Sequence, residues 1–347
     1  MNATITTVIP TFRRPQLLRR ALRSVLRQTF RDFRVCVYDN ASGDDTESVV
    51  AQTAGADPRV AYFRHAENIG GGANFLFGMQ RIDTPFFSFL SDDDVLLPSF
   101  FETALAAFER SPAALMAAAS TVEVTAAGEV RYVPLALWRR DGVYEPPEGA
   151  FAMLDNRHPT WTTILFRREA IQKVGLLDLE VGAPSDLDYE LRIAARFPIV
   201  VSQRACGAYV SHADSGSARE TTAVVPGFDR ICRSFSADDR IAASTRRLLV
   251  ARLRRQLRMK LLEIWVKSLV RGDDEAALEA AAAMRDRYGP RAFGWLLTLG
   301  WHACTRVGVA RSALRWLESR RLLRRGDRGR TSLSSQVQVE IREALTA

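Results

Sequence analysis

The chain has 347 residues, of which 47% are hydrophobic, so it can bury a sizeable core as one large domain with an appendage or as two domains. Its net charge of +8 is uneven: residues 241–347 hold 22 Lys and Arg against 10 Asp and Glu, whereas residues 1–240 hold 26 against 30. The four cysteines lie far apart without a Cys-x-x-Cys pair, which argues against a disulfide framework and a zinc site and fits a reducing compartment.

Strand and helix patterns alternate through the first 90 residues. Short β-branched or aromatic runs predict strands, and apolar residues that recur every three or four positions predict helices. The predicted strands are 5–10, 33–38, 60–64 and 86–90, and the helices between them are 15–28, 45–54 and 73–79. This alternation predicts an α/β fold with a mostly parallel sheet that is flanked by helices on both faces.

The pattern is less regular over residues 113–240 and becomes helical beyond 240. In the irregular part we expect strands at 115–125 and 162–166, and helices at 168–174 and 185–196. The expected C-terminal helices are 245–270, 274–288, 292–309 and 312–323. The expected organisation is a sheet domain over 1–240, a basic helical region over 241–325 and a flexible tail over 326–347.

Three consecutive acids, Asp92, Asp93 and Asp94, follow the predicted strand 86–90. Carboxylates packed at the end of a buried strand repel one another, and burying their charge costs free energy unless something pairs it. Mg²⁺ and Mn²⁺ bind carboxylate oxygens and keep positions open for phosphate, so this acid run indicates a metal–diphosphate site. The alternative is a solvated acidic turn, since aspartate is common where strands end.

Two other polar residues also follow predicted strands, Asp39 after 33–38 and Asn68 after 60–64. Ligands of parallel α/β sheets bind in the crevice at the carboxyl ends of the strands. We therefore expect Asp39, Asn68 and the acid run to converge at one edge of the sheet. That convergence favours the metal site over the solvated turn.

Six segments carry a family resemblance: TVIPTFRR at 7–14, SVLRQT at 24–29, VYDNAS at 37–42, NIG at 68–70, FLSDDD at 89–94 and SDLDYELR at 185–192. In this order they resemble family 2 glycosyltransferases of the GT-A fold, over residues 4–215. The resemblance implies a nucleotide-sugar donor and an inverting transfer of the sugar to a hydroxyl group.

The resemblance places the donor at the ends of the first strands. The residues that it implies for donor binding are Pro10, Thr11, Arg13, Asp39, Asn68, Asp92 and Asp93. Asp39 would accept a hydrogen bond from the imide N–H of uracil or thymine, which favours a UDP- or dTDP-sugar. The alternatives are that Asp39 caps a turn and that Asn68 is an ordinary turn residue.

The acid run resembles the DXD-type motif of the family, which implies Mn²⁺ or Mg²⁺ as cofactor. In this interpretation Asp94 binds the metal and Asp92 lies by the ribose or sugar. Ligands two residues apart share a strand face, which favours Asp92 and Asp94 as the metal-binding pair. Asp93 is the alternative ligand, because three consecutive acids leave the register open. His212 matches a late histidine of the family that can approach the metal or diphosphate; the alternative is a structural hydrogen-bond donor.

The resemblance also implies the acceptor side of the site. Asp186, at the start of a predicted helix, matches the general base that removes the proton from the acceptor hydroxyl. An acid in the first helical turn also complements the helix dipole, which is the structural alternative. Ser185 stands where the family often has Glu. Trp161, Thr162 and Asp188 are the expected acceptor contacts, with Trp161 equally plausible as a core residue.

The sequence therefore predicts a metal-dependent inverting glycosyltransferase that acts on a glycan or lipid-linked saccharide, as in cell-surface polysaccharide synthesis. One alternative is a sugar nucleotidyltransferase, which needs a glycine-rich loop after the first strand. The segment Thr11 to Pro15 contains no glycine, which weakens that alternative. The other alternative is a non-catalytic module that binds nucleotide-sugars or membranes.

The C-terminal helices combine arginines with Trp265, Trp295, Trp301 and Trp316. This composition is typical of helices that lie in a membrane interface, so an anionic membrane surface is an expected partner. A helical packing domain with buried tryptophans is the alternative. We expect no nucleic-acid partner, because no recognition motif accompanies the charge. Without a signal-peptide pattern at residues 1–10, we expect a cytoplasmic protein, at the inner face of the membrane if the helices dock there.

Overall fold

The computed structural model describes residues 3–133, 138–156, 158–211, 221–289, 291–306 and 333–346. The chain divides into two compact units. The sheet unit comprises residues 1–179, 186–212 and 329–347, and the helical unit comprises 180–185 and 213–328. The helical unit thus begins before residue 241, the predicted start of the basic helical region.

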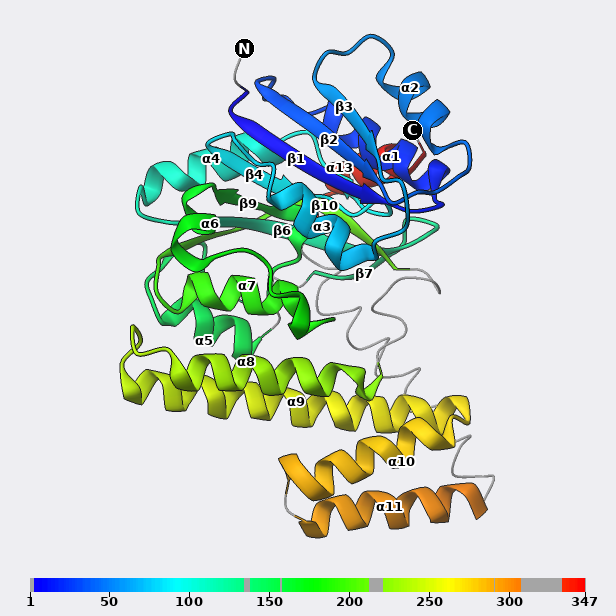
Figure 1. Ribbon diagram of the computed structural model, residues 1–347, viewed down its shortest axis with the longest axis vertical. Coiled ribbons are helices and arrows are strands. Elements are labelled where there is room, and N and C mark those ends of the chain that lie inside the picture. Colours follow the sequence, from blue (N-terminus) through cyan, green and yellow to red (C-terminus); the bar gives the residue numbers. More distant parts are fainter. Residues whose placement is uncertain are drawn as a thin grey trace. The chain divides into compact units, whose positions relative to one another are not determined.

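One sheet organises the sheet unit (Figure 1). Its main path runs β3-β2-β1-β4-β9-β6-β10-β5, with β7 paired to β6 and β8 paired to β10. The strands are β1 Ile5–Thr11, β2 Phe33–Asp39, β3 Val60–Arg64, β4 Phe86–Phe89, β5 Val95–Leu96, β6 Met116–Thr125, β7 Val130–Tyr132, β8 Gly142–Tyr144, β9 Ile164–Arg167 and β10 Ile199–Ser211.

The sheet is parallel in its first half and mixed in its second. β1 is parallel to β2 and β4, and β2 is parallel to β3, as the alternating pattern predicts. β9 runs antiparallel to both β4 and β6. The reason lies in the 3₁₀ turn η2, Trp161–Thr163, from which β9 starts. This turn lies at the edge where β4 ends, because Thr162 bonds to Asp94 there.

Helices cover the sheet because its strands alternate apolar side chains between two faces. On β1, Ile5 and Ile9 join the core beneath α1 and α4, whereas Val8 lies against Gly78 of α3. The helices of this unit are α1 Pro15–Leu26, α2 Thr46–Ala54, α3 Gly71–Met79, α4 Phe100–Arg110, α5 Glu148–Asp155, α6 Glu169–Val174, α7 Ser185–Ala194 and α13 Ser335–Thr346.

The C-terminal segment is not wholly the flexible tail that its polar composition predicted. Ser335–Thr346 forms α13, and Ile341 and Leu345 pack into an apolar cluster with residues of β5, β6 and β10. The cluster includes Val95, which directly follows Asp94. A few apolar residues at helical spacing suffice to dock a short polar helix on an existing core. α13 therefore backs the strand that begins at the acid run.

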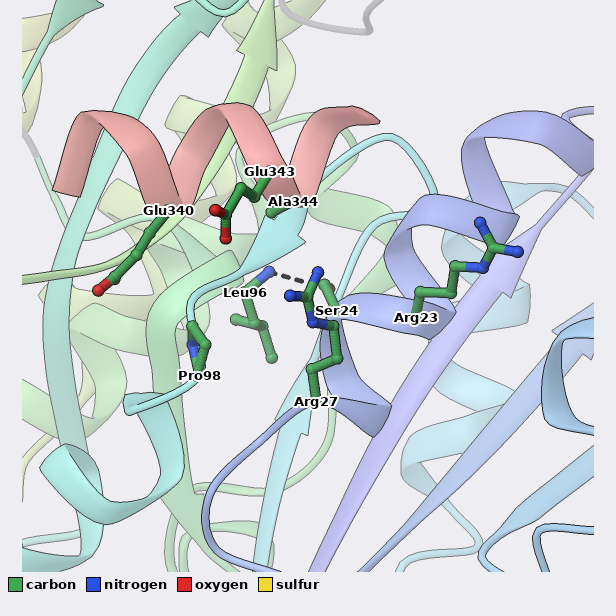
Figure 2. Close-up of a pocket in the computed structure, with 8 residues that line it drawn as sticks. All are labelled: Arg23, Ser24, Arg27, Leu96, Pro98, Glu340, Glu343 and Ala344. Atoms are coloured by element: carbon green, nitrogen blue, oxygen red, sulfur yellow. Dashed lines mark hydrogen bonds between the residues drawn. The ribbon is translucent and has the colours of Figure 1, made fainter. Parts of the chain in front are cut away.

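Figure 2 shows α13 opposite the end of α1, with Glu340 and Glu343 on one side of a small cavity and Arg23 and Arg27 on the other. The cavity has a volume of about 30 Å³, which holds only about one or two water molecules. It is far too small for a nucleotide-sugar, so this gap belongs to the packing of α13.

The helical unit consists of η5 Thr222–Val224, α8 Val225–Ala237, α9 Ala243–Arg271, α10 Asp274–Ala283, η6 Met284–Tyr288 and α11 Arg291–Arg306. Leucines every four residues on α9, such as Leu249, Leu253 and Leu257, are buried. Gly272 ends α9 in the left-handed conformation, where glycine carries no steric penalty. The helix predicted at 312–323 lies outside the described residues. Among the described helices, none has the length and apolarity needed to cross a bilayer.

Candidate active site

The ends of β1, β2 and β4 bring the first predicted site residues together. In the parallel register Thr11 lies beside Asp39, and Pro10 lies beside Tyr38. The buried hydroxyl of Thr11 donates to Oδ2 of Asp92 at 2.8 Å. The carboxyl edge of the sheet therefore joins the ends of β1 and β2 to the acid run, as the topology predicts.

All three residues of the acid run are buried, at 6%, 7% and 2% exposure for Asp92, Asp93 and Asp94. Arg14, at the start of α1, bridges the first two: its Nη1 lies 3.3 Å from Asp92 Oδ1 and 3.1 Å from Asp93 Oδ2. Asp94 is held differently. Its Oδ2 accepts from the hydroxyl of Thr162 at 2.5 Å, and its Oδ1 accepts from the backbone N–H of Val210 at 3.1 Å.

Burial dominates the electrostatics of this run. It raises the pKa of Asp92 to about 6 and that of Asp94 to about 8, and the charge of Asp93 adds to both rises. Burial also lowers the pKa of Arg20 on α1, while Asp93 and Asp94 oppose that shift. The carboxylates therefore stand in a low-dielectric site where added positive charge is favourable.

These residues fit a divalent cation of the kind that binds diphosphates. Among the described His, Cys, Asp and Glu side chains, no three are arranged as a preformed metal site. Mg²⁺ in nucleotide sites is commonly bound by one or two carboxylates together with substrate phosphates and water, so a three-ligand cage is not needed. Clustered carboxylates with raised pKa values supply suitable oxygen donors. Both oxygens of Asp94 already accept a hydrogen bond, from Thr162 and from Val210.

Asp39 lies buried between two neighbouring segments. Its Oδ1 accepts from the backbone N–H of Ser42 at 2.9 Å and from the Ser42 hydroxyl at 2.5 Å, and its Oδ2 accepts from the hydroxyl of Tyr62 at 2.6 Å. Asp39 is thus a turn cap, the alternative noted from the sequence. Oδ1 already accepts two bonds, whereas Oδ2 accepts one, so its second lone pair leaves acceptor capacity for a nucleotide base.

The loop around Ser42 contains backbone strain. Arg13 and Ala41 have positive φ angles of 54° and 59°, a conformation that side chains other than Gly rarely adopt. The backbone N–H of Arg13 donates to the hydroxyl of Ser42 at 2.8 Å, which ties the two loops together. Strain of this kind persists where the surrounding structure fixes a functional loop.

Asn68 braces the loop that follows β3. Its Oδ1 accepts from Nδ2 of Asn40 and from the backbone N–H of Gly70, both at 2.9 Å. Asn40 in turn accepts from the N–H of Ile69 at 2.8 Å. Asn68 therefore lies beside the Asp39 loop, as expected, and its side-chain oxygen serves the turn.

The two acids of α7 have different surroundings. Asp186 is partly exposed in the first turn, and its Oδ1 accepts from the N–H of Leu187 at 2.7 Å. Asp188 is 2% exposed and pairs with Nε of Arg192 at 2.8 Å. Arg192 also donates to the carbonyl oxygens of Val174 and Leu176. Asp188 thus anchors α7 to the preceding loop, whereas Asp186 stays accessible.

The expected acceptor residues on η2 adjoin the acid run. Trp161 stacks on Phe89 of β4, with ring centroids 4.6 Å apart and planes 18° apart. Thr162, beside it, is buried and holds Asp94. Trp161 thus packs against the strand that leads into the acid run. His212 lies outside the described residues.

Sequence reasoning missed several residues of this region. Arg14 bridges Asp92 and Asp93, Tyr62 bonds to Asp39, and His158 lies against a buried Glu190. The position of Arg14, three residues after the end of β1, was a signal for an anion contact. No such signal marked Tyr62, His158 or Glu190, because the partner of each lies 23 or more residues away in the chain.

Comparisons with known proteins agree with this geometry. Residues 6–175 match the family model described as glycosyl transferase family 2. A stretch of 100 residues is 36% identical to the GalNAc(5)-diNAcBac-PP-undecaprenol beta-1,3-glucosyltransferase of Campylobacter jejuni. That match covers 28% of this chain and 32% of the relative, so the chain spans about a third of the length of this relative.

Solved structures resemble the chain over most of its length. S. aureus TarS 1–349 in complex with UDP-GlcNAc has a TM-score of 0.64 at 14% identity, covering 91% of this chain and 92% of TarS 1–349. The mannosyltransferase PcManGT of Pyrobaculum calidifontis, in complex with GDP-Man and Mn²⁺, has a TM-score of 0.54 at 16% identity, covering 90% and 85%. At these identities the likeness establishes the fold alone.

Proposed function

We propose that this chain, whose residues 6–175 match the family model described as glycosyl transferase family 2 and whose fold is of the GT-A type, transfers a sugar from a nucleotide diphosphate donor to a hydroxyl group. The observation that carries the proposal is the convergence of Thr11, Asp39 and the acid run at one sheet edge. The partly exposed Asp186 belongs to the same unit.

In this reaction Asp186 accepts the proton of the acceptor hydroxyl while the oxygen of that hydroxyl attacks the anomeric carbon. The bond between that carbon and the diphosphate oxygen breaks, and the nucleoside diphosphate leaves with the bonding electrons. Attack opposite to the leaving group inverts the anomeric configuration. Asp39 and the strained loop at Arg13 bind the nucleotide, and Trp161 forms part of the acceptor side.

The acid run would hold Mn²⁺ or Mg²⁺, and the raised pKa values of Asp92 and Asp94 support this assignment. When bound, such a cation supplies positive charge that stabilises the departing diphosphate. Arg14 contributes a fixed positive charge beside the same carboxylates. The relative PcManGT was solved with Mn²⁺, which supports a divalent cation here.

The donor in this proposal is a UDP-sugar. TarS binds UDP-GlcNAc, and an acceptor such as Asp39 at the end of β2 suits the imide N–H of uracil. The acceptor is a glycan or a lipid-linked saccharide of the kind named for the Campylobacter relative. This places the protein in the synthesis of cell-surface polysaccharide.

A thermal-shift panel tests the donor site. Purified protein is heated with UDP, dTDP, GDP or CMP, each with Mn²⁺, Mg²⁺ or EDTA. Ligand at a hundred times its dissociation constant stabilises the folded state by about 2.7 kcal/mol, which raises the melting temperature measurably. We expect UDP with a divalent cation to stabilise most. No shift with any nucleotide would contradict the proposal.

The helical unit offers a surface for membrane docking, which we include in the proposal. On α11, Trp295, Leu296 and Leu299 are 55%, 62% and 61% exposed, and the Arg285 guanidinium lies 4.9 Å from the Trp295 ring centre. Exposed apolar residues beside arginines are typical of interfacial helices. Trp265 and Trp301 are less exposed, and Trp301 donates to Asp274 at 3.0 Å. Trp316 lies outside the described residues.

The same unit has an open cavity of about 640 Å³ lined by Arg233, Arg254 and Arg287; Asp229 is the only acid among the described residues that line it. The arginines give it the charge to attract anionic headgroups. In this proposal the enzyme acts at the inner face of the membrane.

Vesicle binding tests this surface. The protein should co-sediment with phosphatidylglycerol vesicles at low salt and be released by added salt, because exposed charges are screened. Replacing both Trp295 and Leu299 with serine should weaken binding, whereas Met259→Ser, an equally exposed apolar residue on α9, should not. Equally poor binding to neutral and anionic vesicles at low salt would exclude membrane docking.

A further inference from the structure

A buried carboxylate that the proposed reaction does not use lies on α7, one turn after Asp186. Glu190 is 0% exposed, and Nδ1 of His158 lies 3.3 Å from its Oε2. Among the described residues, neither oxygen of Glu190 accepts a hydrogen bond of normal geometry. A carboxylate buried in this way costs free energy, and apolar residues of similar size would pack the site more stably.

The charged and polar groups around Glu190 act in opposite directions. Burial raises the pKa of Glu190 to about 7, and Asp186 on the same helix adds to the rise. His158 and the indole N–H of Trp161 both lower the pKa, although the indole lacks the geometry of a normal hydrogen bond. The pKa of the Glu190 carboxyl therefore depends on three neighbouring side chains, those of His158, Trp161 and Asp186.

The turn η2 connects this cluster to the acid run. Trp161 faces Glu190, and the next residue, Thr162, donates its hydroxyl to Asp94. Thr163 fixes the turn on β6, because its hydroxyl bonds to the Thr121 hydroxyl at 2.6 Å and to the Ala119 carbonyl at 2.7 Å. The consecutive residues of η2 thus make three contacts. Trp161 meets α7, the helix of Asp186; Thr162 meets the acid run; and Thr163 meets the sheet.

We propose that Glu190 is a positioning residue that holds His158 and Trp161 and thereby couples the helix of Asp186 to the turn that holds Asp94. The inference rests on the proposed function and deepens it, because it names residues that shape the acceptor side of the site. Hydrogen bonds in catalytic sites are often long without substrate and tighten when it binds. When an acceptor packs on Trp161, the contact between the Trp161 indole and Glu190 tightens.

The pairing can be tested without any enzymatic activity. The chain has four histidines, so H158Q identifies the His158 ring resonances in an NMR spectrum. In E190Q the titration midpoint of His158 should fall, because in wild type the two groups titrate as a coupled pair near neutral pH and the ionised carboxylate stabilises the imidazolium. An unchanged midpoint would overturn the pairing even if the protein proves to be a transferase.

The pH dependence of the melting temperature gives a second measurement on the Glu190 carboxyl. The ordinary pKa of a Glu carboxyl is 4.5, whereas that of folded Glu190 is about 7. Between these values the unfolded chain releases the proton and the folded chain keeps it, so the wild type loses stability as the pH rises. E190Q lacks this loss, and its melting temperature relative to wild type should rise from pH 4.5 to 7. A constant difference would contradict the proposal.

Measuring turnover together with UDP binding distinguishes a positioning role of Glu190 from a role in folding alone. E190Q should bind UDP as wild type does but release UDP from the UDP-sugar with kcat lowered about tenfold or more, since small misplacement of reacting groups is costly. H158Q should show the same loss. E169Q, an exposed acid at the start of α6, should retain wild-type turnover. Weakened UDP binding in E190Q, or normal turnover in both cluster variants, would overturn the proposal. If wild type itself shows no turnover, the proposed function fails, while the NMR result still decides the pairing.

Discussion

Replacing Asp186 with asparagine should lower kcat for sugar transfer by about 10²–10⁴-fold, the usual contribution of a general base. Asparagine keeps the shape of the side chain and its bond to the N–H of Leu187, but it cannot accept the proton of the acceptor hydroxyl. The affinity for UDP should stay unchanged, because the nucleotide binds through other residues. Steady-state kinetics and UDP titration of the same preparation measure both quantities.

The control for this variant addresses the helix dipole. Glu169 lies in the first turn of α6, as Asp186 lies in the first turn of α7, and it is exposed. If Asp186 served only the dipole, D186N and E169Q would both change stability by a few tenths of a kcal/mol and leave kcat intact. Wild-type turnover in D186N would therefore contradict its assignment as the base.

Replacing Asp94 with asparagine should abolish the part of UDP stabilisation that requires a divalent cation. Asparagine keeps one oxygen for Thr162 or Val210 but removes the charge that the cation needs. In wild type, EDTA should have the same effect. The melting temperature with UDP and Mn²⁺, compared with UDP and EDTA, measures this difference in each protein.

The metal effect should grow between pH 6 and 8. Asp92 and Asp94 have pKa values raised to about 6 and about 8, so each retains its proton above its ordinary range. A cation binds the ionised carboxylates and must displace those protons, so binding strengthens as the pH rises through this window. D83N is the matched control, because Asp83 is an exposed acid of the same unit paired with Arg34. Metal-dependent stabilisation of D94N equal to wild type would exclude Asp94 as a metal-site residue.

In the first 90 residues, local sequence periodicity predicted the strands and their parallel order. The strands at Ile5–Thr11, Phe33–Asp39 and Val60–Arg64 match their predicted positions within one residue. Their periodicity is a property of neighbouring residues, and the alternation of strand with helix imposes parallel order. From that order alone the strand ends had to meet, which is why Asp39 and the acid run were predicted to lie together.

Beyond residue 110 the pattern was less informative. β10 at Ile199–Ser211 and α8 at Val225–Ala237 were not predicted, and α13 was expected to be part of a flexible tail. The long strand β10 has irregular register against β6 near Ala205, which interrupts its alternation. α13 contributes only a few apolar residues, and its burial depends on a cluster built by distant strands.

The sequence by itself determined the α/β alternation, the edge of the sheet where the site lies and the residue types gathered there, since all three follow from local periodicity and parallel order. Only the tertiary structure decided which group each carboxylate meets: Asp94 with Thr162, Asp39 with Tyr62, and Glu190 with His158. These partners lie 68, 23 and 32 residues apart in the chain. Such pairs form through packing of whole elements, and no periodicity of neighbouring residues records them.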